Sequence, residues 1–457
     1  MSETKVAAMK KRHIALAALA IIGVGGGTAA FVAAPTIHEG APGETPELGR
    51  YGDYTVGTQE LVFSMSDRIT FEKLGMATGG TSSETRELQV RMYYPAQAES
   101  GAAGASPVTY THTMDPPDME PVTLEYAGIA YPDASAISGE KYPLVIMSHG
   151  FNGWSTQASN LAEHIASRGY VVASIYHADM KLEGATDFLH SFAKVLASRS
   201  LDQRQILTQI LERAGSDNSG AFAAIDTEQI GLIGYSMGGY GALATAGGDY
   251  DYDSGTYGVV PSDAMAPVRA AAGDDAGIDA VIAFAPWGGQ SDNRVWSAET
   301  LGQIIAPVMI VAGNQDDVSN YEDGISWIFD SLGGTDRHML VFREARHNIV
   351  GNAFEMPEGA PFRAIEFVNE PVWRQDRINS INQHFVAAFL DLHLKGNEEM
   401  AAYLDVPVKD ANASTWDVST GEQLNGKLAG EGEPDHWRGF QRRWAVGLEM
   451  HRKAAGE

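Results

Sequence analysis

Residues 229–241 read Gln-Ile-Gly-Leu-Ile-Gly-Tyr-Ser-Met-Gly-Gly-Tyr-Gly, and this stretch decides the fold. A short apolar run ends in Gly234-Tyr235-Ser236-Met237-Gly238, which has the G-x-S-x-G pattern of a nucleophile elbow. In such an elbow the serine lies on a sharp turn between a buried strand and a helix. The backbone there is strained, so the flanking positions need residues that have no Cβ. Because Gly234 and Gly238 meet that need and a helix-compatible stretch follows, we predict that Ser236 is a nucleophile.

Two candidate partners of Ser236 follow it in the order acid and then histidine, as the elbow pattern requires. An apolar run at 308–312 leads into Gly313-Asn314-Gln315-Asp316-Asp317, and a strand-like run at 337–342 leads to His347. A serine hydroxyl is a poor nucleophile until a histidine takes its proton and a carboxylate orients that histidine. We therefore predict Ser236, His347 and one of the two neighbouring aspartates as the catalytic residues.

These motifs resemble the α/β-hydrolase superfamily, in the branch of dienelactone-hydrolase-like, platelet-activating-factor-acetylhydrolase-like and polyester-hydrolase-like esterases. The resemblance spans about 140–350, includes Tyr142–Phe151, and extends back to Val90–Pro95 and forward to the helix near Asn379–Lys395. It implies an α/β-hydrolase fold, with a mostly parallel central sheet, antiparallel N-terminal strands and helices on both faces.

The resemblance also bears on the choice of acid. The family pattern places the acid three residues after the glycine, which favours Asp316 over its rival Asp317. His338 is a weaker rival to His347 as the base, because it begins a predicted strand where a solvated histidine is the ordinary interpretation.

The tetrahedral intermediate of acyl transfer needs two backbone donors. One should be the N–H of Met237, the residue after the nucleophile. By resemblance, the other is the N–H of Phe151, on the loop after the predicted strand 144–148. Trp154 and Trp287 lie on loops at the C-terminal ends of predicted strands, so both are candidates for substrate contact. Ala285-Pro286-Trp287 resembles the substrate-cleft segment of polyester hydrolases, although ordinary packing is the alternative for each tryptophan.

Composition excludes several classes of partner and chemistry. The chain has 457 residues, with 32 Lys and Arg against 59 Asp and Glu, and its formal charge of −27 should repel nucleic acids and anionic membranes. It has no cysteine, which excludes disulfides, thiolate metal sites and the cysteine nucleophile of authentic dienelactone hydrolases. Asp249–Asp253 alternates carboxylates like a calcium loop, but Ser254 and Val260 stand where such a loop needs Gly and Glu. We therefore expect no metal and no cofactor.

The chain divides into four predicted parts. Residues 1–34 carry a basic stretch, Lys10–Arg12, and an apolar stretch, Ile14–Val24, which favour a signal peptide and export to the periplasm or medium. An uncleaved anchor is the alternative, because the apolar region to Ala34 is just long enough to span a bilayer. Residues 35–58 are a predicted linker and 59–396 the hydrolase domain, with a lid at 351–375. Residues 397–457 form a predicted extension packed on the core.

One element is expected within that extension. Trp437, Phe440, Trp444 and Leu448 recur at helical spacing, which predicts a helix.

The sequence thus favours a serine esterase that cleaves small-molecule or polymeric carboxylic esters through an acyl-enzyme. Lipase, polyester hydrolase, acyltransferase and peptidase are alternatives within enzymes. The alternative outside enzymes is a hydrolase-fold binding protein that has lost catalysis, whose signature would be a missing triad member.

Overall fold

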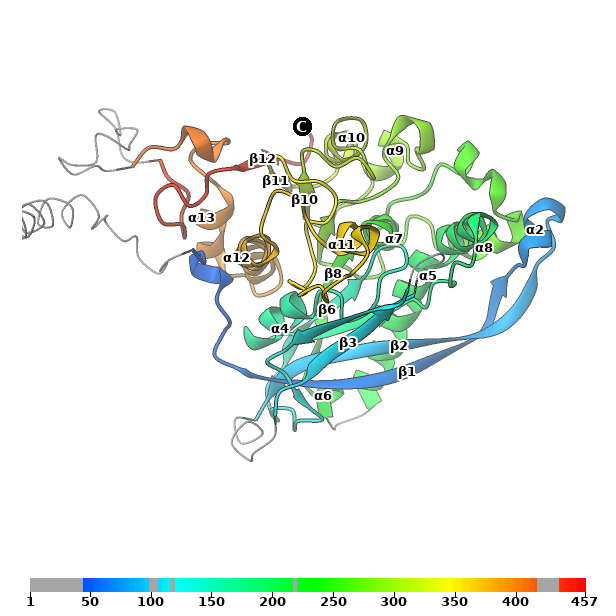
Figure 1. The fold of residues 1–457 in the computed structure, drawn as a ribbon, viewed down its shortest axis with the longest axis horizontal. Helices are drawn as coiled ribbons and strands as arrows, with labels where there is room; N and C mark the ends of the chain where they lie inside the picture. Colours follow the sequence, from blue (N-terminus) through cyan, green and yellow to red (C-terminus); the bar gives the residue numbers. More distant parts are fainter. Residues whose placement is uncertain (1–43, 98–105, 116–119, 217–219, 417–434) are drawn as a thin grey trace, which may run out of the picture.

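The computed structural model describes residues 44–97, 106–115, 120–216, 220–416 and 435–457 (Figure 1). The predicted signal peptide or anchor at 1–34 therefore lies outside the described residues, as does the first part of the predicted linker. Among the residues that are described, no helix has the length and apolar character needed to cross a bilayer.

A ten-stranded mixed sheet forms the centre of the molecule. From one edge to the other, its strands are β12 (Leu448–Lys453), β11 (Arg337–Phe342), β10 (Val308–Gly313), β9 (Ala280–Phe284), β8 (Ile225–Tyr235), β6 (Tyr142–Ser148), β7 (Val171–Tyr176), β2 (Ser82–Ala96), β1 (Thr55–Thr70) and β5 (Tyr131–Pro132). The six strands from β11 to β7 are mutually parallel, whereas β2 and β12 pair antiparallel with their neighbours. The predicted α/β-hydrolase fold is confirmed.

The middle strands are buried along their whole length because helices cover both faces of the sheet. Every residue of β6, β9, β10 and β11 is buried, as expected of parallel strands between two helical layers. On one face, α4 (Ser159–Ser167) packs with α12 (Gln375–His393); on the other, α5 (Ala185–Ser216) packs with α7 (Met237–Thr245) and α8 (Ser262–Ala270) (Figure 1).

The remaining described helices are short. They are η1 (Glu47–Gly49), α2 (Lys73–Thr78), α6 (Gly220–Ala223), η2 (Gly255–Val259), η3 (Ser291–Asn293), α9 (Ala298–Leu301), η4 (Tyr321–Ile325), α10 (Ser326–Ser331), α11 (Phe362–Val368), η5 (Glu398–Met400), α13 (Ala401–Leu404) and η6 (Ala411–Ala413).

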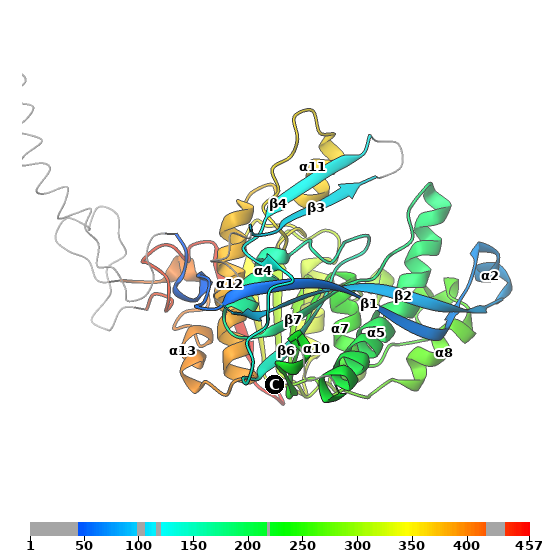
Figure 2. The same ribbon diagram turned by 90° about the horizontal axis from the view of Figure 1, so that it is seen from below.

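A separate hairpin projects from the sheet beside α11 (Figure 2). Its strands are β3 (Thr109–Met114) and β4 (Val122–Ala127), paired antiparallel. Their inward residues form a second small core with Trp154 and with Ala364 and Val368 of α11. The predicted lid segment 351–375 therefore contains a helix, although its sequence shows no helical periodicity.

Two predictions about the ends of the chain are wrong. The linker does not reach residue 58, because β1 begins at Thr55 and Leu48 is buried against α12, where its N–H donates to His384 Nδ1 at 3.1 Å. The C-terminal helix does not form, because Gly439, Arg443 and Gly447 all adopt positive φ and break the chain into turns. Instead, Trp437 and Phe440 pack on α12, and β12 extends the sheet beside β11.

Candidate active site

Ser236 lies on the turn between β8 and α7 with φ 52° and ψ −113°, a conformation that L-residues rarely adopt. Glycine is required at the two flanking positions because neighbouring backbone atoms lie too close for a Cβ, and not because of the value of φ. A Cβ on Gly234 would lie 2.3 Å from the Gly238 carbonyl oxygen, and a Cβ on Gly238 would lie 2.1 Å from that of Ser148. The tight packing of β6, β8 and α7 therefore holds the strained serine at the edge of the sheet.

The structure brings Ser236, His347 and Asp316 together. His347 Nε2 lies 3.0 Å from Ser236 Oγ, and His347 Nδ1 lies 2.8 Å from Asp316 Oδ2. The Asp316 side chain is fully buried, and its other oxygen accepts hydrogen bonds from the Val318 and Ser319 amides at 2.9 and 2.8 Å. The imidazole is thus held between a hydroxyl and a fixed carboxylate.

The two rival residues lie elsewhere. Asp317 is exposed and forms an ion pair with Arg346 on the outer side of the turn. His338 is buried on β11, where its ring lies 6.5 Å from that of Phe389 on α12, and neither ring nitrogen has a hydrogen-bond partner among the described residues. Burial lowers the pKa of His338 to about 4. Neither residue contacts the Ser236–His347 pair.

The loop that carries His347 is fixed from two sides. The Tyr235 hydroxyl donates to the His347 carbonyl and the Asn348 side chain, both at 3.3 Å. Asn348 Nδ2 in turn donates to the carbonyls of Glu366 and Asn369, at and just beyond the end of α11. The segment predicted as a lid therefore supports the histidine loop.

The two predicted oxyanion donors lie on either side of Ser236. Met237 is the first residue of α7, so its N–H has no partner within the helix. Phe151 follows Gly150, whose Cβ, if it had one, would lie 3.2 Å from Ser236 Cβ. Among the hydrogen bonds of the described residues, neither the Met237 N–H nor the Phe151 N–H has an acceptor, so both are available to a developing oxyanion.

The two tryptophans differ in their surroundings. Trp287 donates its backbone N–H to the Ser236 carbonyl at 3.3 Å, and its ring packs edge-on against Phe192 at 5.1 Å. Phe192 and the half-exposed Phe188 also contact the ring of Phe151. An aromatic group of four residues, Phe151, Phe188, Phe192 and Trp287, thus lies beside the serine.

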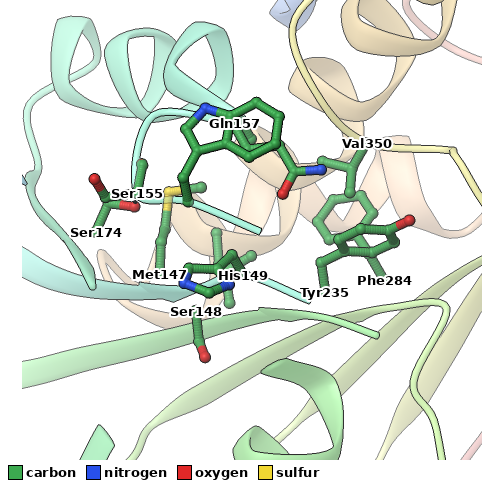
Figure 3. A pocket seen from close by; sticks show the side chains of 12 residues that line it. Met147, Ser148, His149, Ser155, Gln157, Ser174, Tyr235, Phe284 and Val350 are labelled. Carbon is green, nitrogen blue, oxygen red and sulfur yellow. Dashed lines mark hydrogen bonds between the residues drawn. The ribbon is translucent and has the colours of Figure 1, made fainter. Parts of the chain in front are cut away.

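Trp154 does not belong to this group. Its ring stacks on His112 of the β3–β4 hairpin with centroids 3.9 Å apart, and Phe354 packs against it at 5.8 Å. Only 4% of the residue is exposed, and it lines a small cavity of about 30 Å³ together with His149 and Tyr235, which Figure 3 labels. The packing alternative fits Trp154 better than substrate contact does.

A larger cleft lies between the β3–β4 hairpin, the loop after Phe151 and α11. Its volume is about 380 Å³. Its walls combine apolar and charged side chains, and the lining residues are His112, Thr113, Met114, Asp115, Asn152, Gly153, Tyr176, Asp179, Lys181, Leu182, Arg363, Ala364 and Phe367. The loop that carries the Phe151 amide therefore forms one wall of this cleft. α11, which supports the His347 loop, forms another.

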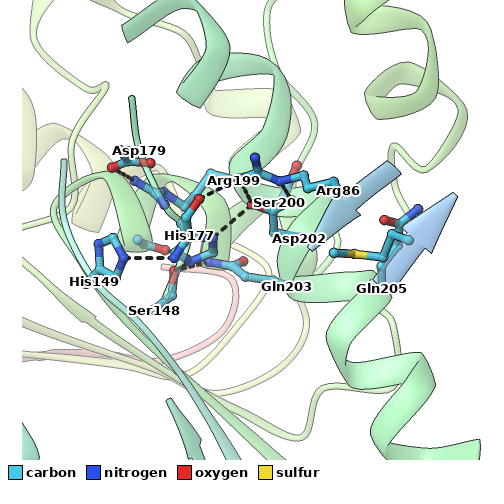
Figure 4. Close-up of polar contacts among 12 residues, drawn as sticks. Arg86, Ser148, His149, His177, Asp179, Arg199, Ser200, Asp202, Gln203 and Gln205 are labelled. Atoms are coloured by element: carbon cyan, nitrogen blue, oxygen red, sulfur yellow. Dashed lines mark hydrogen bonds and ion pairs between the residues drawn. The ribbon is translucent and has the colours of Figure 1, made fainter. Parts of the chain in front are cut away.

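A buried polar network that was not predicted from the sequence lies near the elbow (Figure 4). Ser148 Oγ lies 2.8 Å from His177 Nε2, and His177 Nδ1 lies 3.0 Å from Asp202, which also pairs with Arg68 and Arg86. These residues have the order of a Ser-His-Asp triad, but all three are buried, so no substrate reaches them. Burial, followed by the nearby Arg199 charge, lowers the pKa of His177 to about 4, so that its ring is neutral.

A signal for this network was present in the sequence. Ser148-His149 and His177-Ala178-Asp179 follow two adjacent apolar strands, whose carboxyl ends meet at the same edge of the sheet. In the described part of the chain, no three His, Asp or Glu side chains come together as metal ligands.

Comparison with known proteins gives partial matches. The family model for platelet-activating factor acetylhydrolase, isoform II, matches residues 125–212. Platelet-activating factor acetylhydrolase from Bos taurus is 26% identical over 163 residues, covering 33% of this chain and 32% of the relative. The protein of the same name from Canis lupus familiaris is 24% identical over 176 residues, covering 34% of each.

The matches thus span about a third of the length of these relatives. The family-model match runs from β4 to near the end of α5 and includes the Phe151 loop, while Ser236, Asp316 and His347 lie beyond it. The chain therefore has the α/β-hydrolase fold, and over about a third of its length it is similar to platelet-activating factor acetylhydrolases.

Proposed function

We propose that the protein is a serine esterase that cleaves carboxylic esters through an acyl-enzyme. The observation that carries the proposal is the chain of contacts from Ser236 Oγ to His347 at 3.0 Å and from His347 to Asp316 at 2.8 Å, built on a strained strand–helix turn. A serine, an imidazole and a buried carboxylate in this order have the geometry of nucleophilic acyl transfer.

The reaction follows from the positions of these groups. Ser236 Oγ attacks the ester carbonyl while His347 Nε2 takes the hydroxyl proton, and Asp316 stabilises the imidazolium that forms. The oxyanion of the tetrahedral intermediate accepts hydrogen bonds from the Phe151 and Met237 amides. The C–O bond to the alcohol then breaks as His347 returns the proton to the leaving oxygen. A water molecule, deprotonated by His347, attacks the acyl-enzyme by the same steps and releases the acid.

The surroundings of Ser236 favour an apolar acyl group. Phe188 and Phe192 present aromatic surface beside the serine, and Trp287 closes the inner side of that surface. The names of the relatives make acetyl esters the first substrates to test. Longer acyl chains and polyesters test the lipase and polyester-hydrolase alternatives, and transfer to an added alcohol tests the acyltransferase.

The decisive experiment uses a panel of p-nitrophenyl esters with increasing acyl length, together with a fluorescent phosphonate that labels activated serines. The wild-type protein should hydrolyse part of the panel and take up the label, whereas Ser236→Ala should do neither while keeping its melting temperature. A protein that binds esters without turnover and resists the phosphonate would establish the binding-protein alternative. Ester hydrolysis that survives in Ser236→Ala would show that Ser236 is not the nucleophile.

We also propose that the protein is exported. The support is the basic stretch Lys10–Arg12 followed by the apolar Ile14–Val24. N-terminal sequencing of protein from the native host should give a first residue near 31–35. An intact Met1 in the membrane fraction would establish the anchor instead.

A further inference from the structure

The Phe151 amide can stabilise an oxyanion only if its peptide plane is oriented toward Ser236. In a trans peptide the C=O of one residue and the N–H of the next point in opposite directions, and the described chain has no cis bond. Whatever holds the Gly150 carbonyl therefore also sets the direction of the Phe151 N–H.

Three donors hold the Gly150 carbonyl oxygen. His149 Nδ1 lies 2.6 Å from it, the Gly153 N–H donates at 3.2 Å, and Arg199 Nη2 donates at 3.4 Å. The tautomer of His149 follows from its other nitrogen, because Nε2 accepts the His177 backbone N–H at 3.0 Å and so carries no proton. The His149 proton is therefore on Nδ1 and is donated to the Gly150 carbonyl.

The next peptide, between Phe151 and Asn152, is held by Asp179. Its Oδ2 accepts the Asn152 N–H at 2.9 Å and the Arg199 Nη2–H at 2.8 Å. Asn152 has φ 55°, so this contact also stabilises a strained residue next to Phe151. The side chains of Arg199 and Asp179 are 0% and 3% exposed, so this ion pair is shielded from solvent (Figure 4).

We propose that the Arg199–Asp179 pair is a positioning device for the oxyanion site. Arg199 contacts the Gly150 carbonyl before Phe151, Asp179 contacts the Asn152 amide after it, and the two are joined by their own ion pair. The pair thereby fixes the Phe151 N–H toward the place where the oxyanion forms. Both side chains are almost fully buried, so we place each as acting through the Phe151 amide. This inference rests on the proposed esterase function.

The pair should matter more in the transition state than in the ground state. The carbonyl oxygen of a bound ester carries little charge, whereas the oxyanion of the intermediate carries nearly a full one, so a misdirected donor reduces kcat more than it raises KM. Loss of one oxyanion donor in a serine hydrolase costs about 10²–10³ in kcat. A donor that is present but misdirected should cost part of that, on the order of 10- to 100-fold.

The experiment compares Arg199→Met and Asp179→Asn with wild type on a soluble p-nitrophenyl ester. Asp179→Asn keeps an oxygen that can accept the Asn152 N–H but removes the charge that holds Arg199. The matched control is Arg204→Met on the same helix, because Arg204 donates to the Ala244 carbonyl at 2.8 Å and pairs with Asp274, away from the Phe151 loop. kcat should fall in the first two variants, with KM nearly constant, and stay near wild type in the control.

A second measurement separates this role from a general loss of structure. A trifluoromethyl ketone adds reversibly to an active serine and places its hemiketal oxyanion where the intermediate's oxygen lies. Its Ki should rise by the same factor as kcat/KM falls, while the binding of the acid product should be unchanged. Arg199→Lys, which restores a cation, should recover part of both losses.

The outcomes can be told apart. If wild type hydrolyses no ester and takes up no phosphonate, the proposed function fails. If wild type is active but folded Arg199→Met and Asp179→Asn keep wild-type kcat and ketone affinity, or only KM rises, the positioning role is overturned. If Arg199→Met does not fold, Asp179→Asn decides alone.

Discussion

Replacing Asp316 with Asn tests the assignment of the acid most directly. In the folded protein, Asp316 Oδ1 accepts the Val318 and Ser319 amides, and Oδ2 faces His347 Nδ1 at 2.8 Å. An asparagine must keep its oxygen toward the two amides, because these can only donate. Its NH₂ group then faces His347 Nδ1, which has to become an acceptor. The proton moves to Nε2, and the imidazole can no longer take the proton of Ser236.

The size of the effect follows from this tautomer. The same change in a serine protease lowers kcat by about 10⁴, which is about 5 kcal/mol of transition-state free energy. Folding should change little, because the two backbone contacts survive. Asp317→Asn is the matched control, because the Asp317 side chain is 56% exposed and its ion pair with Arg346 lies at the surface, where solvent screening leaves such pairs little effect on stability.

The assay measures kcat for both variants at near-neutral pH on a soluble ester, beside thermal melting. Asp316→Asn should be nearly inactive with a melting temperature close to wild type, and Asp317→Asn should be nearly wild type in both. A severe loss of kcat in Asp317→Asn, together with an active Asp316→Asn, would refute the argument from the tautomer. It would identify Asp317 as the acid.

Two further predictions concern stability. Burial lowers the pKa of His338 to about 4, so the folded ring stays neutral while the unfolded chain takes up a proton below about pH 6.5. The stability linked to this neutral ring is present above pH 6.5 and is lost toward pH 4, at about 1.4 kcal/mol per pH unit. Both ring nitrogens also lack partners among the described residues, so His338→Leu should raise the free energy of unfolding by about 1 kcal/mol at pH 7 and by more at pH 5. Urea unfolding at both pH values checks this. If the free energy of unfolding depended on pH in the variant as it does in wild type, the prediction would be contradicted. Gly238→Ala places a Cβ 2.1 Å from the Ser148 carbonyl and should abolish ester hydrolysis and lower the melting temperature, whereas Gly255→Ala, where a Cβ meets nothing within 4 Å, should do neither.

The sequence contains enough to predict the fold class and to bring the candidate site together. Ser236, Asp316 and His347 each follow an apolar run that is long enough for a buried strand, and parallel strands place their carboxyl ends at one edge. Periodicity alone therefore locates the three residues near one another. It does not give the contacts between them, because these depend on the register of β8 to β11.

The remaining elements depend on contacts that periodicity does not show. The spacing of Trp437 and Phe440 suggests a helix, but positive φ at Gly439 and Gly447 turns the chain away from helical geometry. Leu448-Glu449-Met450 alternates apolar and polar residues, which predicts the strand β12. The helical spacing of Trp437, Phe440, Trp444 and Leu448 led to the wrong prediction instead. The position of Trp154 could not be predicted either, because residues 128–141 separate the β3–β4 hairpin that covers it from β6, the strand before Trp154.

The C-terminal strand has a practical consequence for anyone who makes this protein. β12 covers the outer edge of β11 along all six residues from Arg337 to Phe342, and the buried Arg337 guanidinium donates to the carbonyls of Ala454 and Glu457. A variant shortened before Leu448 would leave β11, an apolar strand, with an unpaired row of N–H and C=O groups, and an open edge of this kind recruits strands from other molecules. Shortened or proteolytically trimmed preparations should therefore precipitate while their active-site residues are still intact.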